Sequence, residues 1–174
     1  MADAICNTSP FQYLHQLGRL DLLPRLLGRV LLPPAVASEL HVGRTRGVSL
    51  PDPALLDWVE SRAPRMSAPA LATESSLGRG ETEALALAFE TGGLLVLDDG
   101  EARRVAARLG LSYTGTLGVL RRARQAGLVP RLAPELDRLA ALGFRFDRAV
   151  REEQNHPRRP LLAAAASPSR VPSC

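Results

Sequence analysis

The sequence predicts an α/β domain built around a central, mostly parallel sheet. Short apolar segments alternate with segments of helical periodicity, and short turns join them. The apolar segment at residues 94–97 lacks the polar alternation that a strand with one solvated face would show. Hydrophobic residues make up 45% of the 174 residues, enough for a buried core. Strands that alternate with helices in this way form βαβ units, so we expect a parallel sheet.

Two strands are expected in the first third of the chain, at residues 4–7 and 30–32. Ser9 and Pro10 suit the N-cap and the first position of a helix that Gly18 closes. The helices expected in this third cover residues 10–16, 20–27 and 34–41. Residues 43–53 are expected to form a loop, and residues 54–61 a short helix or a strand around Trp58.

The second half repeats the alternation more clearly, with glycines at the expected ends of helices. Strands are expected at residues 94–97 and 111–113, and helices at residues 81–90, 101–109, 116–126, 134–142 and 147–153. The remaining residues are mostly Pro, Arg, Ala and Ser, a composition typical of disorder. We therefore expect one domain over residues 1–153 and a disordered tail over 154–174.

The charge pattern restricts the mechanisms available to the chain. All 22 basic residues are arginines, and the net charge is +4. The arginine excess has two interpretations, codon bias in a GC-rich genome or a polyanionic partner such as RNA. The absence of lysine excludes P-loop, Schiff-base and receiver-type phosphorelay sites, which each need one. No signal peptide or membrane span is recognisable, so a cytoplasmic protein is expected.

Polar residues follow three of the predicted strands. Asn7 ends the first, Asp98 and Asp99 follow residue 97, and Thr114 and Thr116 flank the end of the last. Ligands of open parallel sheets bind beyond the carboxyl ends of the strands. These side chains are therefore expected to gather at one edge of the sheet.

Two helical carboxylates are candidates to join them. At about 100° per residue, Ala84 and Leu85 fall within about 60° of Glu81, so Glu81 faces the sheet from the start of its helix. Glu83 and Glu90 fall on the opposite side and are expected to be solvated. Glu39 borders an apolar stripe of its own helix. A carboxylate turned inward needs a partner, and a cation would supply one.

This donor set consists of oxygen atoms, without His or Cys. Hard oxygen ligands favour Mg²⁺ or Mn²⁺ over Zn²⁺, and such an ion could hold a phosphodiester and activate water. Each residue also has a simpler interpretation. Asp98 and Asp99 could cap the next helix, Glu39 could be solvated, Glu81 could face the helix dipole, and Thr116 could be an N-cap.

Five segments in order resemble PIN-domain proteins of the uncharacterised branch related to VapC toxins. The similarity covers about residues 4–150, and the segments are residues 6–10 (CNTSP), 30–39 (VLLPPAVASE), 77–84 (LGRGETEA), 97–103 (LDDGEAR) and 114–120 (TGTLGVL). The resemblance implies a compact α/β/α nuclease domain that cleaves RNA with Mg²⁺ or Mn²⁺. It often also implies a toxin partnered by a small antitoxin protein.

The acidic quartet of that family would fall on Asn7, Glu39, Glu81 and Asp99. The last three are the candidate catalytic residues, and Asp98 is a further candidate metal ligand. Asn7 departs from the pattern because the nuclease consensus has Asp there, which predicts weaker metal binding or a different working metal. Candidate RNA contacts are Thr8, Arg103 and Thr116.

Two functions therefore compete at this point. The first is a metal-dependent endoribonuclease, with RNA as substrate and an antitoxin as partner. The second is a catalytically weakened PIN-like domain that binds RNA or protein without turnover, because Asn7 has replaced a charged ligand. Apolar helix faces also suggest a homodimer.

Overall fold

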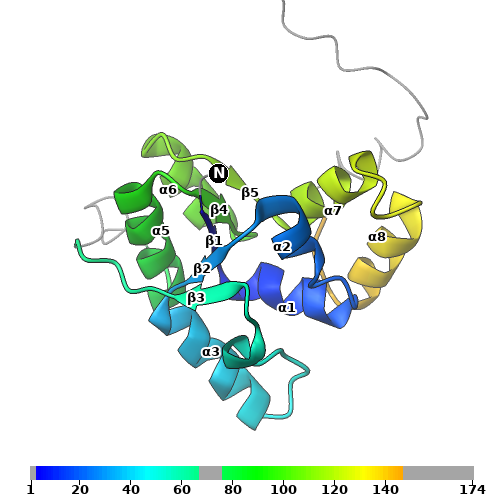
Figure 1. The fold of residues 1–174 in the computed structure, drawn as a ribbon, viewed down its shortest axis with the longest axis horizontal. Coiled ribbons are helices and arrows are strands. Elements are labelled where there is room, and N and C mark those ends of the chain that lie inside the picture. Colours follow the sequence, from blue (N-terminus) through cyan, green and yellow to red (C-terminus); the bar gives the residue numbers. More distant parts are fainter. Residues whose placement is uncertain (1–2, 67–75, 147–174) are drawn as a thin grey trace, which may run out of the picture. The chain divides into compact units, whose positions relative to one another are not determined.

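The structure is a computed structural model in which residues 3–66 and 76–146 are described. Its centre is a sheet of five parallel strands in the order β3-β2-β1-β4-β5 (Figure 1). The strands are β1 (Ala4–Cys6), β2 (Val30–Leu32), β3 (Val59–Ser61), β4 (Leu94–Val96) and β5 (Tyr113–Thr114). The predicted parallel α/β fold is confirmed.

The central strand β1 pairs with β2 on one side and β4 on the other. Ile5 lies opposite Leu31 of β2 and opposite Leu95 of β4. The chain fills the β2–β3 half of the sheet first and the β4–β5 half second, so the order reverses between β1 and β4. In open α/β sheets this reversal opens a crevice beyond the carboxyl ends of the two strands. The residues after Cys6 and Val96 therefore border the favoured ligand position.

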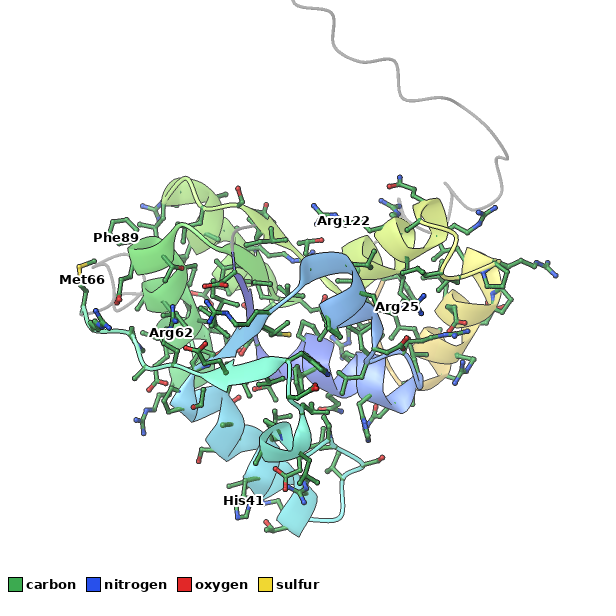
Figure 2. All side chains as sticks on the ribbon, in the orientation of Figure 1. Arg25, His41, Arg62, Met66, Phe89 and Arg122 are labelled. Atoms are coloured by element: carbon green, nitrogen blue, oxygen red, sulfur yellow. The ribbon has the colours of Figure 1, made fainter. Side chains whose placement is uncertain are left out.

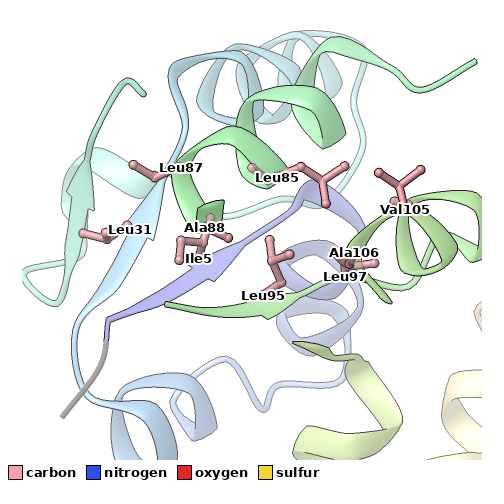
Figure 3. Packing of buried hydrophobic residues seen from close by; sticks show 11 residues of the cluster. Ile5, Leu31, Leu85, Leu87, Ala88, Leu95, Leu97, Val105 and Ala106 are labelled. Carbon is pink, nitrogen blue, oxygen red and sulfur yellow. The ribbon is translucent and has the colours of Figure 1, made fainter. Parts of the chain in front are cut away.

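Helices α5 (Arg79–Thr91) and α6 (Gly100–Arg108) cover one face of the sheet. Ile5, Leu31 and Leu95 project from the strands into a buried cluster with residues of these helices (Figure 3). The helical members of the cluster are Ala84, Leu85, Leu87, Ala88, Ala102, Val105 and Ala106. The small alanines let both helices approach the sheet closely, which accounts for a core with few aromatic residues.

The opposite face is covered by α1 (Thr8–Gln16), α2 (Leu22–Leu27), α7 (Thr116–Gln125) and α8 (Leu132–Ala141) (Figure 1). Helix α7 contacts α1, α2 and α8, so it lies at the centre of this layer. Helix α3 (Pro34–Thr45) begins after β2 and packs against α5 and α1. The arrangement is the predicted α/β/α sandwich.

Several predicted boundaries were wrong. Helix α1 begins at Thr8 with Asn7 as N-cap, not at Pro10. Helix α3 continues to Thr45, although Gly43 was expected to open a loop. A Cβ on Gly43 would lie 2.4 Å from Cδ1 of Leu50, so this glycine serves close packing and does not end the helix.

The remaining differences concern short or terminal elements. The segment predicted as a short helix or a strand at 54–61 contains both, the 3₁₀ helix η1 (Pro53–Leu55) and strand β3. The last strand was expected at residues 111–113, but β5 comprises only Tyr113–Thr114. The compact unit ends at Phe144. The helix expected at 147–153, the domain boundary at 153 and the tail at 154–174 lie outside the described residues. None of the helices in the described ranges has the length and apolar character needed to cross a bilayer.

Candidate metal centre at the carboxyl edge of the sheet

Asn7 lies at the carboxyl end of the central strand and is 1% exposed. Its backbone N–H donates to Val96 O at 2.9 Å, which extends the pairing of β1 with β4 by one residue. Its side-chain Nδ2 donates to Oε1 of Glu81 at 3.1 Å. Its Oδ1 atom is buried and has no hydrogen-bond partner among the residues that the structure describes. A buried amide oxygen without a partner is costly, so this atom marks a position where a ligand would be stabilising.

Glu81 belongs to the first turn of α5 and is half-buried. The bond from Asn7 shows that its side chain turns toward the sheet, as the helical periodicity predicted. Gly78 is the N-cap of this helix, and a Cβ there would lie 2.5 Å from Oε2 of Glu81. The absence of a side chain at Gly78 leaves the carboxylate the room to reach Asn7.

Glu39 approaches the same region from α3 and is exposed. The Thr8 hydroxyl donates to its Oε2 atom, and the Gly80 N–H donates to its Oε1 atom at 3.2 Å. A Cβ on Gly80 would lie 2.7 Å from that Oε1 atom. Glu39 therefore joins the starts of α1 and α5, and Asn7, Glu39 and Glu81 are brought together by neighbouring hydrogen bonds.

Both carboxylate oxygens of Asp98 accept hydrogen bonds from other residues of the protein. Its Oδ1 accepts from the Thr116 N–H at 2.9 Å and its Oδ2 accepts from the Thr116 hydroxyl at 2.6 Å. Arg103 Nη2 adds a longer contact at 3.3 Å. Burial raises the pKa of Asp98, and the hydrogen bonds from Thr116 and the charge of Arg103 oppose that rise. Asp98 thus ties the end of β4 to the start of α7.

Asp99 is the N-cap of α6 and is exposed. Its Oδ1 accepts from the Ala102 N–H at 2.8 Å, the bond expected of a capping aspartate. Helix capping therefore accounts for one oxygen of Asp99. Asp99 comes two residues after Leu97, the position beside Asn7, so it stands at the edge of the sheet that bears the other candidates.

The three candidate RNA contacts have structural partners. Thr116 is 0% exposed, and its hydroxyl is held by Asp98. Gly115, and not Thr116, is the N-cap of α7. Arg103 Nε donates to Leu97 O at 3.0 Å, which fixes the turn that carries both aspartates. Thr8 donates to Glu39.

Sequence reasoning missed two residues that shape the site. Gly80 supplies the N–H that holds Glu39. Glu83 was expected to be solvated, but its Oε2 accepts from the Ala35 N–H at 2.8 Å, so it caps α3 from α5. Its Oε1 accepts from Arg79 Nε at 3.0 Å. The i, i+4 spacing of Arg79 and Glu83 could have indicated the ion pair between them. The hydrogen bond from Ala35 to Glu83 joins two helices that are distant in sequence, so local spacing could not indicate it.

The chemistry of these donors decides whether a metal ion fits. Within the described ranges, no three His, Cys, Asp or Glu side chains come together closely enough to hold an ion. The orphaned Asn7 oxygen changes this assessment, because an amide oxygen is a hard ligand and Glu81 is bonded to the same side chain. With Glu39 nearby, the donors fit Mg²⁺ or Mn²⁺. They would not suit Zn²⁺, which favours nitrogen and sulfur.

The comparisons with known proteins agree with this architecture. No curated protein matches the chain. A solved PilT N-terminus domain protein from the hyperthermophilic archaeon Sulfolobus solfataricus is similar in fold, with a TM-score of 0.51 and 19% sequence identity. The match covers 70% of this chain and 92% of that one. Residues 3–155 match the family DUF3368, described as a PIN domain. The chain therefore belongs to this PIN-domain family, whose relatives are typically nucleases and generally use divalent metal ions.

Proposed function

We propose that the protein is an endoribonuclease that depends on Mg²⁺ or Mn²⁺. The observation that carries this proposal is the buried Oδ1 atom of Asn7, which has no partner within residues 3–66 and 76–146 and belongs to a side chain bonded to Glu81. Membership of the PIN-domain family supports the nuclease class. RNA as the substrate rests on the resemblance to the VapC-related branch.

The chain's own residues would divide the work as follows. Asn7, Glu39 and Glu81 would hold the ion, and Asp99 would contribute the oxygen that its capping bond leaves over. A bound divalent ion polarises a phosphodiester and lowers the pKa of a water molecule that attacks phosphorus. Thr8 and Gly80 orient the Glu39 carboxylate, and the Asn7 amide orients Glu81. Two full negative charges on the glutamates balance the charge of one divalent ion.

The arrangement of arginines supports a polyanionic substrate. Helices α6 and α7 both begin at this edge of the sheet, at Asp99 and at the Thr116–Asp98 contact. Exposed arginines occur along both helices, at residues 104, 108, 122 and 124. Their guanidinium groups could bind phosphates and release counterions from RNA.

The experiment is cleavage of a panel of labelled structured RNAs with Mg²⁺, with Mn²⁺ and with chelator. We expect cleavage that requires metal and is lost in Glu81→Gln and Asp99→Asn. The matched control is Asp137→Asn, which removes one carboxylate charge from an exposed position of α8. This control should cleave as the unmodified protein does.

Calorimetric titration of metal into the same samples separates the competing functions. Metal binding without cleavage would favour a narrow RNA specificity, because the centre would then be intact. Absence of both metal binding and cleavage would contradict the nuclease. RNA binding alone would then favour the weakened PIN-like module suggested by the neutral Asn7.

The toxin role is a further part of the proposal and has separate tests. A small antitoxin gene beside this one, whose product binds the protein and suppresses its cleavage, would support that role. Growth arrest on expression, relieved by Glu81→Gln, would support it independently. Light scattering of the purified protein would decide whether it forms the expected homodimer.

A further inference from the structure

A cavity lies between α3, η1 and β3, and none of the candidate metal ligands lines it. Its volume is about 280 Å³. Its lining includes Ala37, His41 and Arg44 of α3 together with Asp52, Leu56 and Val59. Figure 2 labels His41 in the lower part of the view, where η1 lies against α3. Nothing established about the chain accounts for this cavity.

The cavity and the acidic site lie on opposite faces of α3. At about 100° per residue, Ala37, His41 and Arg44 fall about 140–200° around the helix from Glu39. The diameter of a helix with its side chains is about 10–12 Å, so at least that distance separates the two sites. Leu32 and Ser61, which also line the cavity, are the last residues of β2 and β3. The cavity therefore opens at the same edge of the sheet as the acidic site.

The lining combines apolar and polar groups. Leu32, Leu56 and Val59 supply apolar surface, and the Ser61 hydroxyl and the His41 ring supply polar atoms that can donate or accept. Such a combination suits a flat molecule with an apolar face and a polar edge. The volume lies just below the usual range of small-ligand sites, roughly 300–1,000 Å³. A single heterocyclic base has that character and that size class, whereas a dinucleotide would be too large.

The Arg44–Asp52 pair holds one wall of the cavity in place. Arg44 Nη1 lies 2.6 Å from Asp52 Oδ2, and Asp52 Oδ1 accepts from the Ala54 N–H at 3.1 Å. The hydrogen bond from Arg44 lowers the pKa of Asp52, so the pair stays ionised at neutral pH. Because Asp52 engages one edge of the guanidinium, its planar face remains available for stacking on a base.

We propose that this cavity is a subsite that receives one unpaired base of the RNA, close to the phosphodiester that is cut. This proposal rests on the proposed nuclease function and adds a determinant of sequence preference to it. Phosphate contacts and metal ligands position the backbone but do not read sequence, so specificity requires a pocket for a base. The cavity and the acidic site lie across one helix from each other and at the same edge of the sheet, a separation that a few nucleotides can span.

Binding can be measured independently of cleavage. Trp58 is the only tryptophan of the chain and lies between Leu56 and Val59, which line the cavity. We would titrate AMP, CMP, GMP and UMP into the full-length protein in chelator and follow Trp58 fluorescence. Ribose 5-phosphate and inorganic phosphate are the control ligands. We expect saturable fluorescence changes with at least one nucleotide and none with either control ligand.

Two variants address the cavity directly. Ala37→Leu fills the space, and Arg44→Gln removes the guanidinium; each should weaken nucleotide binding by about tenfold or more. The matched controls are Ala107→Leu, at an exposed position of α6, and Arg46→Gln, directly after α3. Neither residue lines the cavity. In the RNA panel, Ala37→Leu should broaden the base preference beside the cut while metal-dependent cleavage persists.

Three results would overturn the proposal. One is the absence of saturable binding by any of the four nucleotides. Another is equal binding of ribose 5-phosphate, which would identify a phosphate site instead of a base pocket. The third is nucleotide binding that Ala37→Leu and Arg44→Gln leave unchanged. Binding that follows the variants while no RNA is cleaved would uphold the base pocket and contradict the nuclease function, so the two failures are distinguishable.

Discussion

The side chain of Asn7 donates a hydrogen bond to Glu81 over 3.1 Å, while its own Oδ1 is buried and has no partner in the described part of the chain. The amide therefore has two roles in one position. Its NH₂ group stabilises the Glu81 carboxylate in the absence of a cation, and its oxygen points to a place for one. A carboxylate at residue 7 could not fulfil the first role because it has no hydrogen to donate.

The first prediction concerns Asn7→Asp. The substitution replaces a hydrogen bond to a charged group by repulsion between two carboxylates, which should destabilise the metal-free protein by about 1–3 kcal/mol. Mg²⁺ or Mn²⁺ should raise its Tm more than that of the unmodified protein, because the added charge strengthens cation binding. Thermal unfolding with chelator and with each metal measures both effects.

The matched control for this substitution is Gln125→Glu, which adds the same charge at an exposed position near the end of α7. Its Tm should respond to divalent ions as that of the unmodified protein does. An equal response of Asn7→Asp and the control would contradict a cation site at Asn7. Gain of cleavage by Asn7→Asp would show that the missing charge limits activity.

A second prediction tests the glycine that accommodates Glu39. In Gly80→Ala, the new Cβ would meet Oε1 of Glu39 at 2.7 Å, so the carboxylate must move and lose the Gly80 N–H. The gain in helix propensity, about 0.5–1 kcal/mol, should offset much of the cost in stability. Metal affinity should fall about tenfold, as expected when a ligand loses the partner that orients it.

Gly100→Ala is the control for Gly80→Ala. Gly100 also stands in the first turn of a helix, and the nearest atom to its Cβ would be Nη1 of Arg104, at 3.9 Å. This variant should keep its metal affinity and lose no stability. Calorimetry and chemical denaturation of both variants provide the comparison, and equal affinities would show that Gly80 does not position Glu39.

Much of the fold could be predicted because local signals agree with it. Strand β2 has the predicted bounds, since an apolar triplet is followed directly by Pro33 and Pro34. Helix α5 ends at Thr91 and is capped by Gly92, which has the left-handed conformation, with a φ of 68°, that glycine adopts readily. Gly43 misled the prediction because its reason is tertiary, the approach of Leu50.

The roles of adjacent acidic residues could not be predicted in the same way. Asp98 and Asp99 are adjacent residues of the same type, and both follow the same apolar segment. Asp98 is taken up by Thr116, eighteen residues later in the sequence, whereas Asp99 caps the helix that follows it. Only the packing of α7 against the end of β4 distinguishes them. The sequence allowed either aspartate to cap the next helix, but it could not show that only Asp99 does so or that Asp98 binds Thr116.

The third prediction separates a scaffold role of Asp98 from a ligand role. Asp98→Ala leaves the buried N–H and hydroxyl of Thr116 without their acceptor, which should cost about 1–3 kcal/mol of unfolding free energy. Thr116→Val removes only the hydroxyl bond and should cost less. In a double-mutant cycle the two should be coupled by about 0.5–3 kcal/mol. Unchanged stability with lost metal binding in Asp98→Ala would instead identify Asp98 as a ligand.

The fourth prediction uses the neighbour of Asn7 as a reporter. Cys6 is 0% exposed, and burial together with the negative charge of Asp98 raises the pKa of its thiol. In a Cys174→Ser background, a thiol reagent should therefore label Cys6 only when the structure opens. A cation bound at Asn7 stabilises the closed state, so labelling should slow about a hundredfold at a metal concentration 100 times Kd.

Asn7→Ser provides the contrast in this labelling experiment, because it removes the amide oxygen that would contact the ion and leaves Cys6 in place. Metal should then slow the labelling of Cys6 much less than it does in the protein that retains Asn7. Rapid labelling of the native protein would contradict the buried position of β1. A cation bound at Asn7 must slow every opening reaction that breaks its site. A slow rate of Cys6 labelling that metal does not change would therefore contradict a cation at Asn7.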